Sequence, residues 1–328
     1  MTLDVLLPLK FDHSFTYNLP KDINAKIGDF VLVPFQNKEI IGVVWGKGSS
    51  VKSFIKIKDI KKKFDLASLS QDTISFIEKF SLYNLVDLGI VLKLFIFKKV
   101  FNKSIKKNKK IIRFSEYSLK KNINFDESQK KAIKILDEKI SYNKFSTTLL
   151  HGITGSGKTL IYFKKIQDFL EKGFQVLVLL PEIALTNQIK ERFKEYFGEY
   201  PALWHSDVSE KNKKLIWEGI ANNQVNLVLG ARSSLFHPFK KLGLIIIDEE
   251  HDQSYKQEDQ IIYNARDMAV LMASIKNISV ILVSATPSLE TYYNTVSKKF
   301  FYISLDKRYK DAQLPEVKFV DLKIKQRK

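Results

Sequence analysis

The most informative absence in this 328-residue sequence is cysteine, which does not occur at all. Without it the chain has neither a disulfide framework nor a thiolate metal site, which fits a reducing compartment. The longest apolar run, residues 85–97, is interrupted by Asp87 and Lys93 and is shorter than the ~20 residues of a membrane helix. The first residues lack the basic segment of a secretory signal. We therefore expect a cytoplasmic protein with no membrane partner.

Negative charge is scarce, since 36 acidic residues stand against 54 basic ones and the formal net charge is +18. Lysine and arginine on a surface displace counterions from phosphates and so favour a nucleic-acid partner. Only six of the basic residues are arginine, and the excess of lysine is accompanied by many Ile and Asn residues, as a composition bias would also produce. Nucleic-acid binding and a merely solvated lysine-rich surface both remain open on charge alone.

The first hundred residues show short strand patterns separated by turn residues such as Gly28 and Gly46, which predicts a small β-barrel. Apolar residues at helical spacing follow over 70–97. The lysine-rich stretch after them predicts a solvated linker. The domains expected are a β-barrel domain with helices at 1–98, the linker at 99–123, a second domain at 124–323 and a tail at 324–328. The barrel strands are expected at 4–8, 15–19, 29–35 and 39–45.

From residue 124 onward, helical patterns alternate with short, very apolar strands, which indicates a parallel sheet covered by helices on both faces. The fold class predicted is therefore α/β, with a small N-terminal β-barrel ahead of this sheet. Helices are expected at 160–172 and 183–197. Strands are expected at 147–150, 175–180, 225–229, 242–247 and 279–284.

A glycine-rich segment lies between the first of these strands and the helix at 160–172. Glycines let successive backbone N–H groups converge on phosphate oxygens, and the N-terminus of the helix adds a favourable dipole. The Lys158 ammonium is expected to reach the β and γ phosphates of ATP, and the Thr159 hydroxyl to bind Mg²⁺. The predicted nucleotide site consists of Gly152, Ile153, Thr154, Gly155, Ser156, Gly157, Lys158 and Thr159.

A carboxylate pair follows the strand at 242–247, at the edge of the sheet where open α/β folds bind ligands. Asp248 can hold Mg²⁺, while Glu249 can polarise an attacking water. An acidic run by itself is usually solvated surface, but paired with the phosphate loop it favours hydrolysis. Lys158, Asp248 and Glu249 are therefore the predicted catalytic residues.

Several motifs together resemble the primosomal replication-restart helicases of superfamily 2. The helicase motifs are Asp248-Glu249-Glu250-His251, Ser284-Ala285-Thr286 after the next strand, the segment 180–188, and Gly230-Ala231-Arg232-Ser233-Ser234. In the N-terminal part the segments 6–9, 15–17 and 27–35 resemble the family's 3′-DNA-binding domain. The resemblance implies a RecA-like helicase lobe behind a β-barrel DNA-binding domain.

The resemblance also implies roles for individual residues. Gln129 would contact the adenine base, and Asp126, three residues earlier, could cap a helix; both can be true. Ser284 and Thr286 would couple nucleotide state to the grip on nucleic acid. Tyr255 could equally be a packing residue. The DNA contacts implied are Arg232, Ser233, Tyr255, Lys256 and Arg266.

As a member of this family the protein would be a bacterial, nucleoid-associated 3′-5′ DNA helicase of replication restart that uses ATP and Mg²⁺. Its partners would be forks, single strands and 3′ ends of DNA, other primosome proteins and single-stranded-DNA-binding protein. The family's second motor lobe, with its zinc-binding cysteines and arginine finger, has no counterpart before residue 328, so we expect zinc only in that half and weak or no turnover by this chain. The alternatives are a nucleotide-gated DNA-structure-binding protein without motor activity, and a related duplex-DNA translocase.

Overall fold

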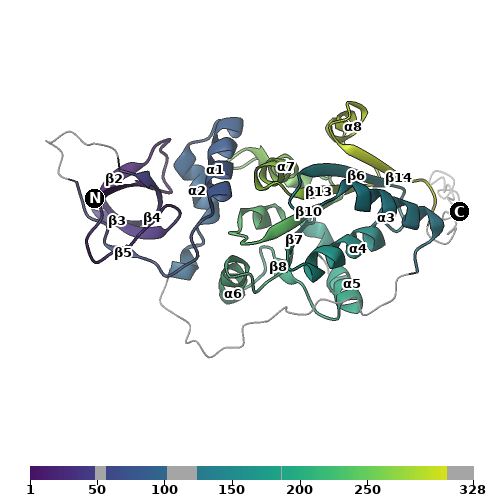
Figure 1. Cartoon of the computed structure of the whole chain (residues 1–328), viewed down its shortest axis with the longest axis horizontal. Helices are drawn as coiled ribbons and strands as arrows, with labels where there is room; N and C mark the ends of the chain where they lie inside the picture. The colour runs from purple at the N-terminus through teal and green to yellow at the C-terminus, as the bar shows by residue number, and fades with distance from the viewer. Residues whose placement is uncertain (49–56, 102–123, 186, 309–328) are drawn as a thin grey trace, which may run out of the picture.

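The computed structural model describes residues 1–48, 57–101, 124–185 and 187–308, which form a small sheet domain, a pair of helices and a large α/β lobe in that order (Figure 1). Most of the predicted linker and the predicted tail lie outside these ranges. Among the described residues every helix is too short or too polar to span a bilayer.

The N-terminal sheet has five antiparallel strands in the order β2-β1-β4-β3-β5. Asn18 in β2 closes it toward a barrel, because its N–H donates to the carbonyl of Lys58 (2.9 Å) and its carbonyl accepts from the N–H of Ile60 (3.0 Å), just before β5. Gly28 turns the chain into β3 at a φ of +89°, where a side chain would strike the carbonyl of Leu69. The strands are β1 (Thr2–Leu6), β2 (Phe15–Asn18), β3 (Phe30–Phe35), β4 (Lys38–Lys47) and β5 (Lys62–Lys63).

The segment predicted to be helical forms two helices, α1 (Gln71–Asn84) and α2 (Leu88–Phe95), followed by a short 3₁₀ turn, η1 (Lys98–Phe101). Leu85 ends α1 in the left-handed conformation, with φ of 54°. Both helices contribute apolar side chains to one core that runs from the barrel through them into the lobe. Phe80 of α1, for example, meets Phe236 and Tyr263 of the lobe at ring-centroid distances of 5.9 and 5.3 Å.

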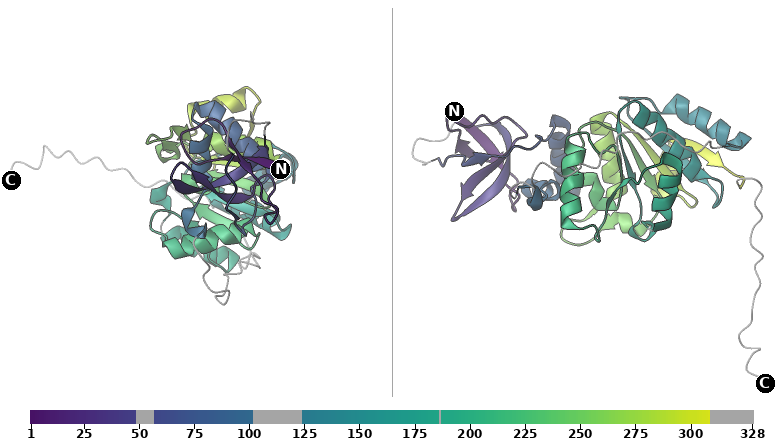
Figure 2. Two further views of the ribbon diagram at one scale, coloured as in Figure 1. Left: turned by 90° about the vertical axis from the view of Figure 1, so that its left-hand side faces the viewer. Right: turned by 90° about the horizontal axis from the view of Figure 1, so that it is seen from below.

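The lobe is built on a seven-stranded, wholly parallel sheet in the order β14-β6-β13-β10-β7-β9-β8, with helices on both faces (Figure 2). The predicted α/β fold is thereby confirmed. The strands are β6 (Ser146–Gly152), β7 (Gln175–Leu179), β8 (Ala202–Trp204), β9 (Leu227–Gly230), β10 (Leu242–Asp248), β13 (Ser279–Ser284) and β14 (Phe301–Leu305). The helices are α3 (Glu127–Lys139), α4 (Lys158–Glu171), α5 (Asn187–Phe197), α6 (Glu210–Ala221), α7 (Ala265–Lys276) and α8 (Leu289–Val296).

Two predictions about the lobe were wrong in detail. The helix expected from residue 183 begins at Asn187, because Pro181 first leads into a separate 3₁₀ turn, η2 (Glu182–Ala184). The edge strands β8 and β14 were not predicted: β8 has only three residues, and β14 was missed although it begins with an apolar run, of which the structure exposes Phe301 and Tyr302.

Three further 3₁₀ or strand elements lie at the carboxyl edge of the sheet. They are η3 (Arg232–Phe236) after β9, η4 (Gln253–Tyr255) after β10, and a small ribbon of β11 (Lys256–Gln257) paired with β12 (Tyr263–Asn264). The loops that follow β6, β10 and β13 reach this same edge, because the strands are parallel. The fold therefore brings the motif residues together.

Candidate nucleotide site and its DNA-facing edge

The phosphate loop connects β6 to α4, as the sequence predicted. Gly155 and Gly157 both have positive φ, 85° and 81°, and Gly157 is the N-cap of α4. Ile153, Thr154 and Gly155 are exposed, while Lys158 and Thr159 in the first turn of α4 are half-buried. The Lys158 ammonium donates to the carbonyl of Gly152 at 2.5 Å. The Lys158 ammonium, the only positive charge of the loop, therefore lies over the loop itself. Phosphate oxygens would replace the Gly152 carbonyl as its hydrogen-bond acceptor.

Two features show that the loop fits a phosphate group. Ser156 Oγ is buried without a hydrogen-bond partner among the described residues. Gly152 leaves no room for a side chain, because a Cβ there would lie 2.6 Å from Ser156 Oγ and 2.9 Å from Leu305 Cβ. The loop is thus packed tightly on its inner side and open on the side where Gly155 faces outward.

Gln129 supports this loop from behind. Asp126 and Gln129 form a capping box at the start of α3, and the Gln129 Nε2 donates to the carbonyl of Ser156 at 3.2 Å. The side chain is fully buried. The predicted cap is confirmed, and the amide lies against the phosphate loop, while the contact of Gln129 with an adenine base stays a prediction.

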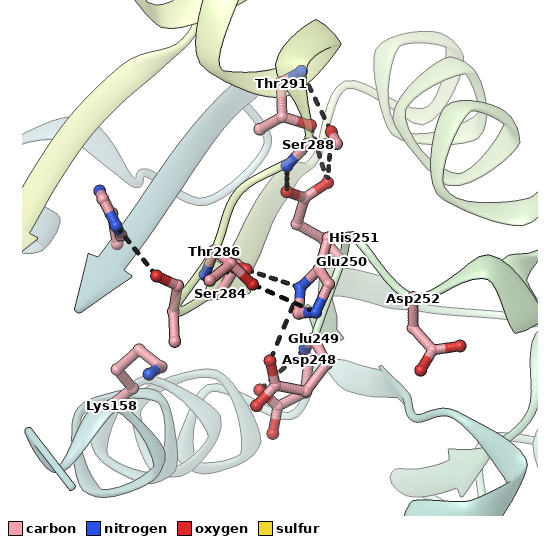
Figure 3. Close-up of polar contacts among 12 residues, drawn as sticks. Lys158, Asp248, Glu249, Glu250, His251, Asp252, Ser284, Thr286, Ser288 and Thr291 are labelled. Atoms are coloured by element: carbon pink, nitrogen blue, oxygen red, sulfur yellow. Dashed lines mark hydrogen bonds and ion pairs between the residues drawn. The ribbon is translucent and has the colours of Figure 1, made fainter. Parts of the chain in front are cut away.

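Asp248 ends β10 opposite Lys158 (Figure 3). Its carboxylate accepts a hydrogen bond from the Tyr162 hydroxyl at 3.0 Å. Burial, reinforced by the neighbouring Glu249, raises the pKa of Asp248 to about 6. Burial lowers the pKa of Lys158, while the two carboxylates oppose that change. A carboxylate whose ionised form is under-compensated suits a cation, which would return its pKa to the ordinary range.

Glu249 is the one catalytic candidate in an unusual backbone conformation, with φ of 49°. Non-glycine residues in the left-handed region concentrate at functional sites. Its carboxylate is about half exposed and lies 3.7 Å from His251 Nδ1. The described residues contain no group of three or more carboxylates and histidines that would hold a metal alone. Mg²⁺, however, is usually held by one or two protein oxygens together with substrate phosphates.

Glu250 points away from Asp248 and Glu249, toward the start of α8 (Figure 3). It is 1% exposed and accepts from the Ser288 N–H and the Thr291 hydroxyl, both at 2.8 Å. The Arg266 guanidinium of α7 donates to the same carboxylate at 3.1 Å. No role was predicted for Glu250, yet its carboxylate connects the end of β10 to α7 and α8.

The structure contradicts the predicted DNA contact of Arg266. Its side chain is 9% exposed and is held by Glu250, by Asp267 at 2.9 Å and by Ser288 at 2.6 Å. A guanidinium surrounded by acceptors in the interior stabilises the fold and is not presented to a nucleic-acid backbone.

The structure also contradicts the predicted DNA contact of Tyr255. The ring is 1% exposed, and its hydroxyl donates to the carbonyls of Asp248 (2.6 Å) and Leu179 (3.0 Å). Tyr255 is therefore the packing residue that the sequence left as the alternative, because a ring enclosed in the core cannot stack on a base.

His251 connects the acidic motif to the Ser-Ala-Thr motif, a link that sequence reasoning missed. Its Nδ1 and the Ser284 hydroxyl are hydrogen-bonded at 2.8 Å, and its Nε2 lies 3.3 Å from the Thr286 hydroxyl (Figure 3). The Thr286 N–H donates to Ser284 Oγ at 3.0 Å. The two residues predicted to couple nucleotide and nucleic acid thus both touch the loop that carries Asp248 and Glu249.

The remaining predicted DNA contacts lie on the surface at the same edge. Ser233 and Lys256 are exposed, and Arg232 is half-buried. Arg232 Nη1 donates to the carbonyls of Ser254 (2.9 Å) and Lys256 (3.2 Å). Arg232 therefore also fixes the loop that follows the two predicted catalytic carboxylates. Another cationic residue that no motif identified is Arg308, whose Cγ lies 4.0 Å from where a Cβ on Gly155 would stand.

Residues 126–295 match the family model of the DEAD/DEAH box helicases, which is more than half of the chain. The chain belongs to the DEAD/DEAH box helicase family. A helicase domain of this family is an ATP-dependent enzyme and implies ATP and Mg²⁺ as ligands. Residues 4–96 match the model of the 3′DNA-binding domain of PriA. The resemblance to the primosomal replication-restart helicases is confirmed by these two matches and by the relatives below.

The replication restart protein PriA of Rickettsia conorii is 44% identical over 325 residues, which cover 97% of this chain and 48% of that protein. The protein of the same name from Bacillus subtilis is 43% identical over 197 residues, 60% of this chain and 24% of that protein. RecG, solved bound to a three-way DNA junction, aligns with a TM-score of 0.43 and 21% identity over 60% of this chain and 27% of that one. The chain spans about half the length of the Rickettsia relative.

Proposed function

We propose that this chain is the nucleotide- and DNA-binding part of an ATP-dependent 3′-5′ DNA helicase that restarts replication at stalled forks. The observation that carries the proposal is the placement of Lys158 and Thr159 opposite Asp248 and Glu249 at one sheet edge, in a chain that also has the 3′DNA-binding domain. Mere nucleotide storage would need the loop and the cation site, but not the second carboxylate, Glu249.

In the proposed site each residue has a separate task. The ammonium of Lys158 leaves the Gly152 carbonyl and donates to phosphate oxygens, and the backbone N–H groups of residues 153–157 surround the same group. Thr159 and Asp248 would hold Mg²⁺, which neutralises charge on the transferred phosphoryl group when bound. Glu249 accepts a proton from the attacking water and orients it. Buried Tyr162 fixes the Asp248 carboxylate through its hydroxyl.

On the DNA side, the barrel would bind the 3′ end of a strand, while Arg232, Ser233 and Lys256 contact the phosphate backbone of a single strand. Backbone contacts suit a motor, because they position the strand without reading its sequence. Association with forks, with other primosome proteins and with single-stranded-DNA-binding protein, in the bacterial cytoplasm near the nucleoid, is proposed from the family.

The preference for a 3′ end is tested by DNA-binding titrations on the complete chain. One arm uses a forked DNA with a free 3′ hydroxyl, the other the same fork with that end blocked by phosphate. We expect tighter binding to the free end at physiological salt, because a net charge of +18 alone would treat the two ends alike. Equal affinity for both forks would reject the proposed role of the barrel.

Turnover is tested by steady-state phosphate release with and without single-stranded DNA. An arginine finger typically contributes about 10³–10⁵ in rate, and by family resemblance it comes from a second lobe. We therefore propose that this chain binds Mg·ATP with little DNA-stimulated hydrolysis until that lobe is supplied. Robust DNA-stimulated hydrolysis by the purified chain, abolished in Glu249→Gln, would show that this chain hydrolyses ATP without a second lobe. That result would contradict the proposed need for the lobe.

A further inference from the structure

The Ser-Ala-Thr segment after β13 contacts a second histidine besides His251. This residue is His151 of β6, which lies beside Ser284 in the register of the parallel sheet. Its Nε2 is 3.2 Å from the carbonyl of Ala285. Since β13 lies between β6 and β10 in the sheet, one imidazole reaches the segment from each side.

The hydrogen bonds of His151 define which ring nitrogen carries the proton. A carbonyl oxygen can only accept, so Nε2 carries the hydrogen and donates it to Ala285. Nδ1 then has a lone pair, and the Tyr302 hydroxyl of β14 donates to it at 2.9 Å. Burial raises the pKa of Tyr302, so its hydroxyl stays protonated at neutral pH. The two bonds connect the Tyr302 hydroxyl through a neutral ring to the Ala285 carbonyl.

His151 is also the residue that precedes the phosphate loop. The next residue, Gly152, offers the carbonyl to which the Lys158 ammonium donates. The N–H of Ile153 donates to the carbonyl of Leu305, at the end of β14, at 3.3 Å. When phosphate oxygens replace the Gly152 carbonyl as the acceptor of Lys158, the change therefore occurs one residue from the His151 ring.

Tyr302 closes this network from the edge of the sheet. Its side chain is 45% exposed, and its ring meets the His151 ring edge to face at a centroid distance of 5.9 Å. Its ring also meets Tyr292 of α8, at 6.2 Å. The chain runs from the Ser-Ala-Thr segment through α8 into β14. The whole of this stretch thus folds back onto the strand that enters the phosphate loop.

The bond from Tyr302 contributes more to geometry than to stability. The phenol is half exposed, so water can replace His151 as its acceptor, and the net gain from the bond is small. The partner of one ring nitrogen determines, however, which tautomer a histidine adopts. In the other tautomer the Nε2 lone pair would face the Ala285 carbonyl, and that contact would be repulsive.

We propose that His151 is a positioning residue that ties the Ser-Ala-Thr segment to the strand entering the phosphate loop, with Tyr302 fixing its ring. The inference deepens the proposed coupling of nucleotide to DNA, and it rests on that proposed function. His251 connects the same segment to the loop of the carboxylates. The segment therefore has one histidine contact to each half of the nucleotide site.

Two variants of the complete chain isolate this link. His151→Phe keeps an aromatic ring and removes both hydrogen bonds, whereas Tyr302→Phe removes only the hydroxyl. Tyr200→Phe is the matched control, because Tyr200 is 40% exposed and its hydroxyl donates to Glu191 at 2.6 Å. Tyr200 precedes β8, at the other end of the sheet from β14.

Nitrogen NMR of the isotope-labelled chain reads the state of its five histidine rings. At mildly alkaline pH, the ring signal that disappears in His151→Phe should show a protonated Nε2 and an unprotonated Nδ1. Tyr302→Phe should shift this Nδ1 resonance, because its donor is gone, and Tyr200→Phe should leave it in place. A protonated Nδ1 in the unaltered chain, or an Nδ1 resonance indifferent to Tyr302→Phe, would overturn the link.

The positioning role is measured as the factor by which oligothymidylate changes the affinity for an Mg-bound, non-hydrolysable ATP analogue. His151→Phe should bring this factor toward one. Tyr302→Phe should reduce it about twofold or more, because one hydrogen bond typically contributes a factor of about two to ten, and Tyr200→Phe should leave it unchanged. An unchanged factor in both His151→Phe and Tyr302→Phe would overturn the positioning role. Failure of the unaltered chain to bind the analogue and DNA would instead overturn the proposed function, on which the ring signal does not depend.

Discussion

His251 Nδ1 lies 2.8 Å from the Ser284 hydroxyl, so the loop that carries the proposed catalytic carboxylates is tied directly to the end of β13. The Thr286 hydroxyl, 3.3 Å from the other ring nitrogen, completes the link. A displacement of Glu249 by bound nucleotide would therefore reach the Ser-Ala-Thr segment through one imidazole ring. This contact gives the proposed coupling a specific physical route.

Ser284→Ala should uncouple the two ligands without removing either site. We expect single-stranded DNA to change the affinity for an Mg-bound, non-hydrolysable ATP analogue several-fold in the unaltered chain, and the analogue to change the DNA affinity by the same factor. In Ser284→Ala both factors should approach one, while each affinity measured alone stays within about twofold. Titrations of each ligand with and without the other measure this, and an unchanged coupling factor in the variant would contradict the route.

The raised pKa of Asp248 predicts a pH-dependent stability. Because the folded-state pKa is about 6 against an ordinary 3.8, ionisation is harder in the folded chain. The free energy of unfolding should therefore fall as pH rises through this range. Asp248→Asn cannot ionise, so with a chelator present it should melt a few degrees above the unaltered chain at about pH 7.5 and nearly equally at about pH 4.5.

Magnesium provides the control for that prediction. Mg²⁺ should raise the melting temperature of the unaltered chain above about pH 6, because it stabilises the ionised carboxylate, and should leave Asp248→Asn unchanged. A variant that melts below the unaltered chain at every pH would show that the Asp248 carboxylate is already compensated.

Arg266 should matter for folding. Arg266→Ala leaves the Glu250 carboxylate buried without its cation, which typically costs about 3–5 kcal/mol, so thermal unfolding should shift downward strongly. Lys256→Ala is the comparison, since its ion pair with Glu258 is on the surface and contributes at most about 1 kcal/mol. We expect the opposite order for DNA affinity: Lys256→Ala should weaken DNA binding more than Arg266→Ala does. The DNA affinity of Lys256→Ala should also depend less on salt concentration. An Arg266→Ala chain that melts normally but loses DNA affinity would restore the original assignment.

The sequence predicted the elements that depend on contiguous residues. The phosphate loop, the carboxylates after β10 and the alternation of helix and strand are local patterns, and all lie where expected. The burial of Tyr255 and Arg266 depends on which side of the backbone meets the core, and that is set by partners distant in the sequence, such as Leu179 for Tyr255 and Glu250 for Arg266. No local pattern contains those partners. The three-residue strand β8 was missed because so short an edge has no periodicity to detect.

Calorimetric titration of the complete chain with Mg·ATP measures whether the loop around Lys158 binds the phosphates of the nucleotide. Lys158→Ala should lose about ten- to hundredfold in affinity, because charge-assisted hydrogen bonds to phosphate contribute roughly 1.5–3 kcal/mol. Lys130→Ala is the matched control, a lysine on α3 that is 60% exposed and paired with Glu127, and it should bind as the unaltered chain does. Equal affinity of the unaltered chain and Lys158→Ala for Mg·ATP would contradict the site and the motor built on it.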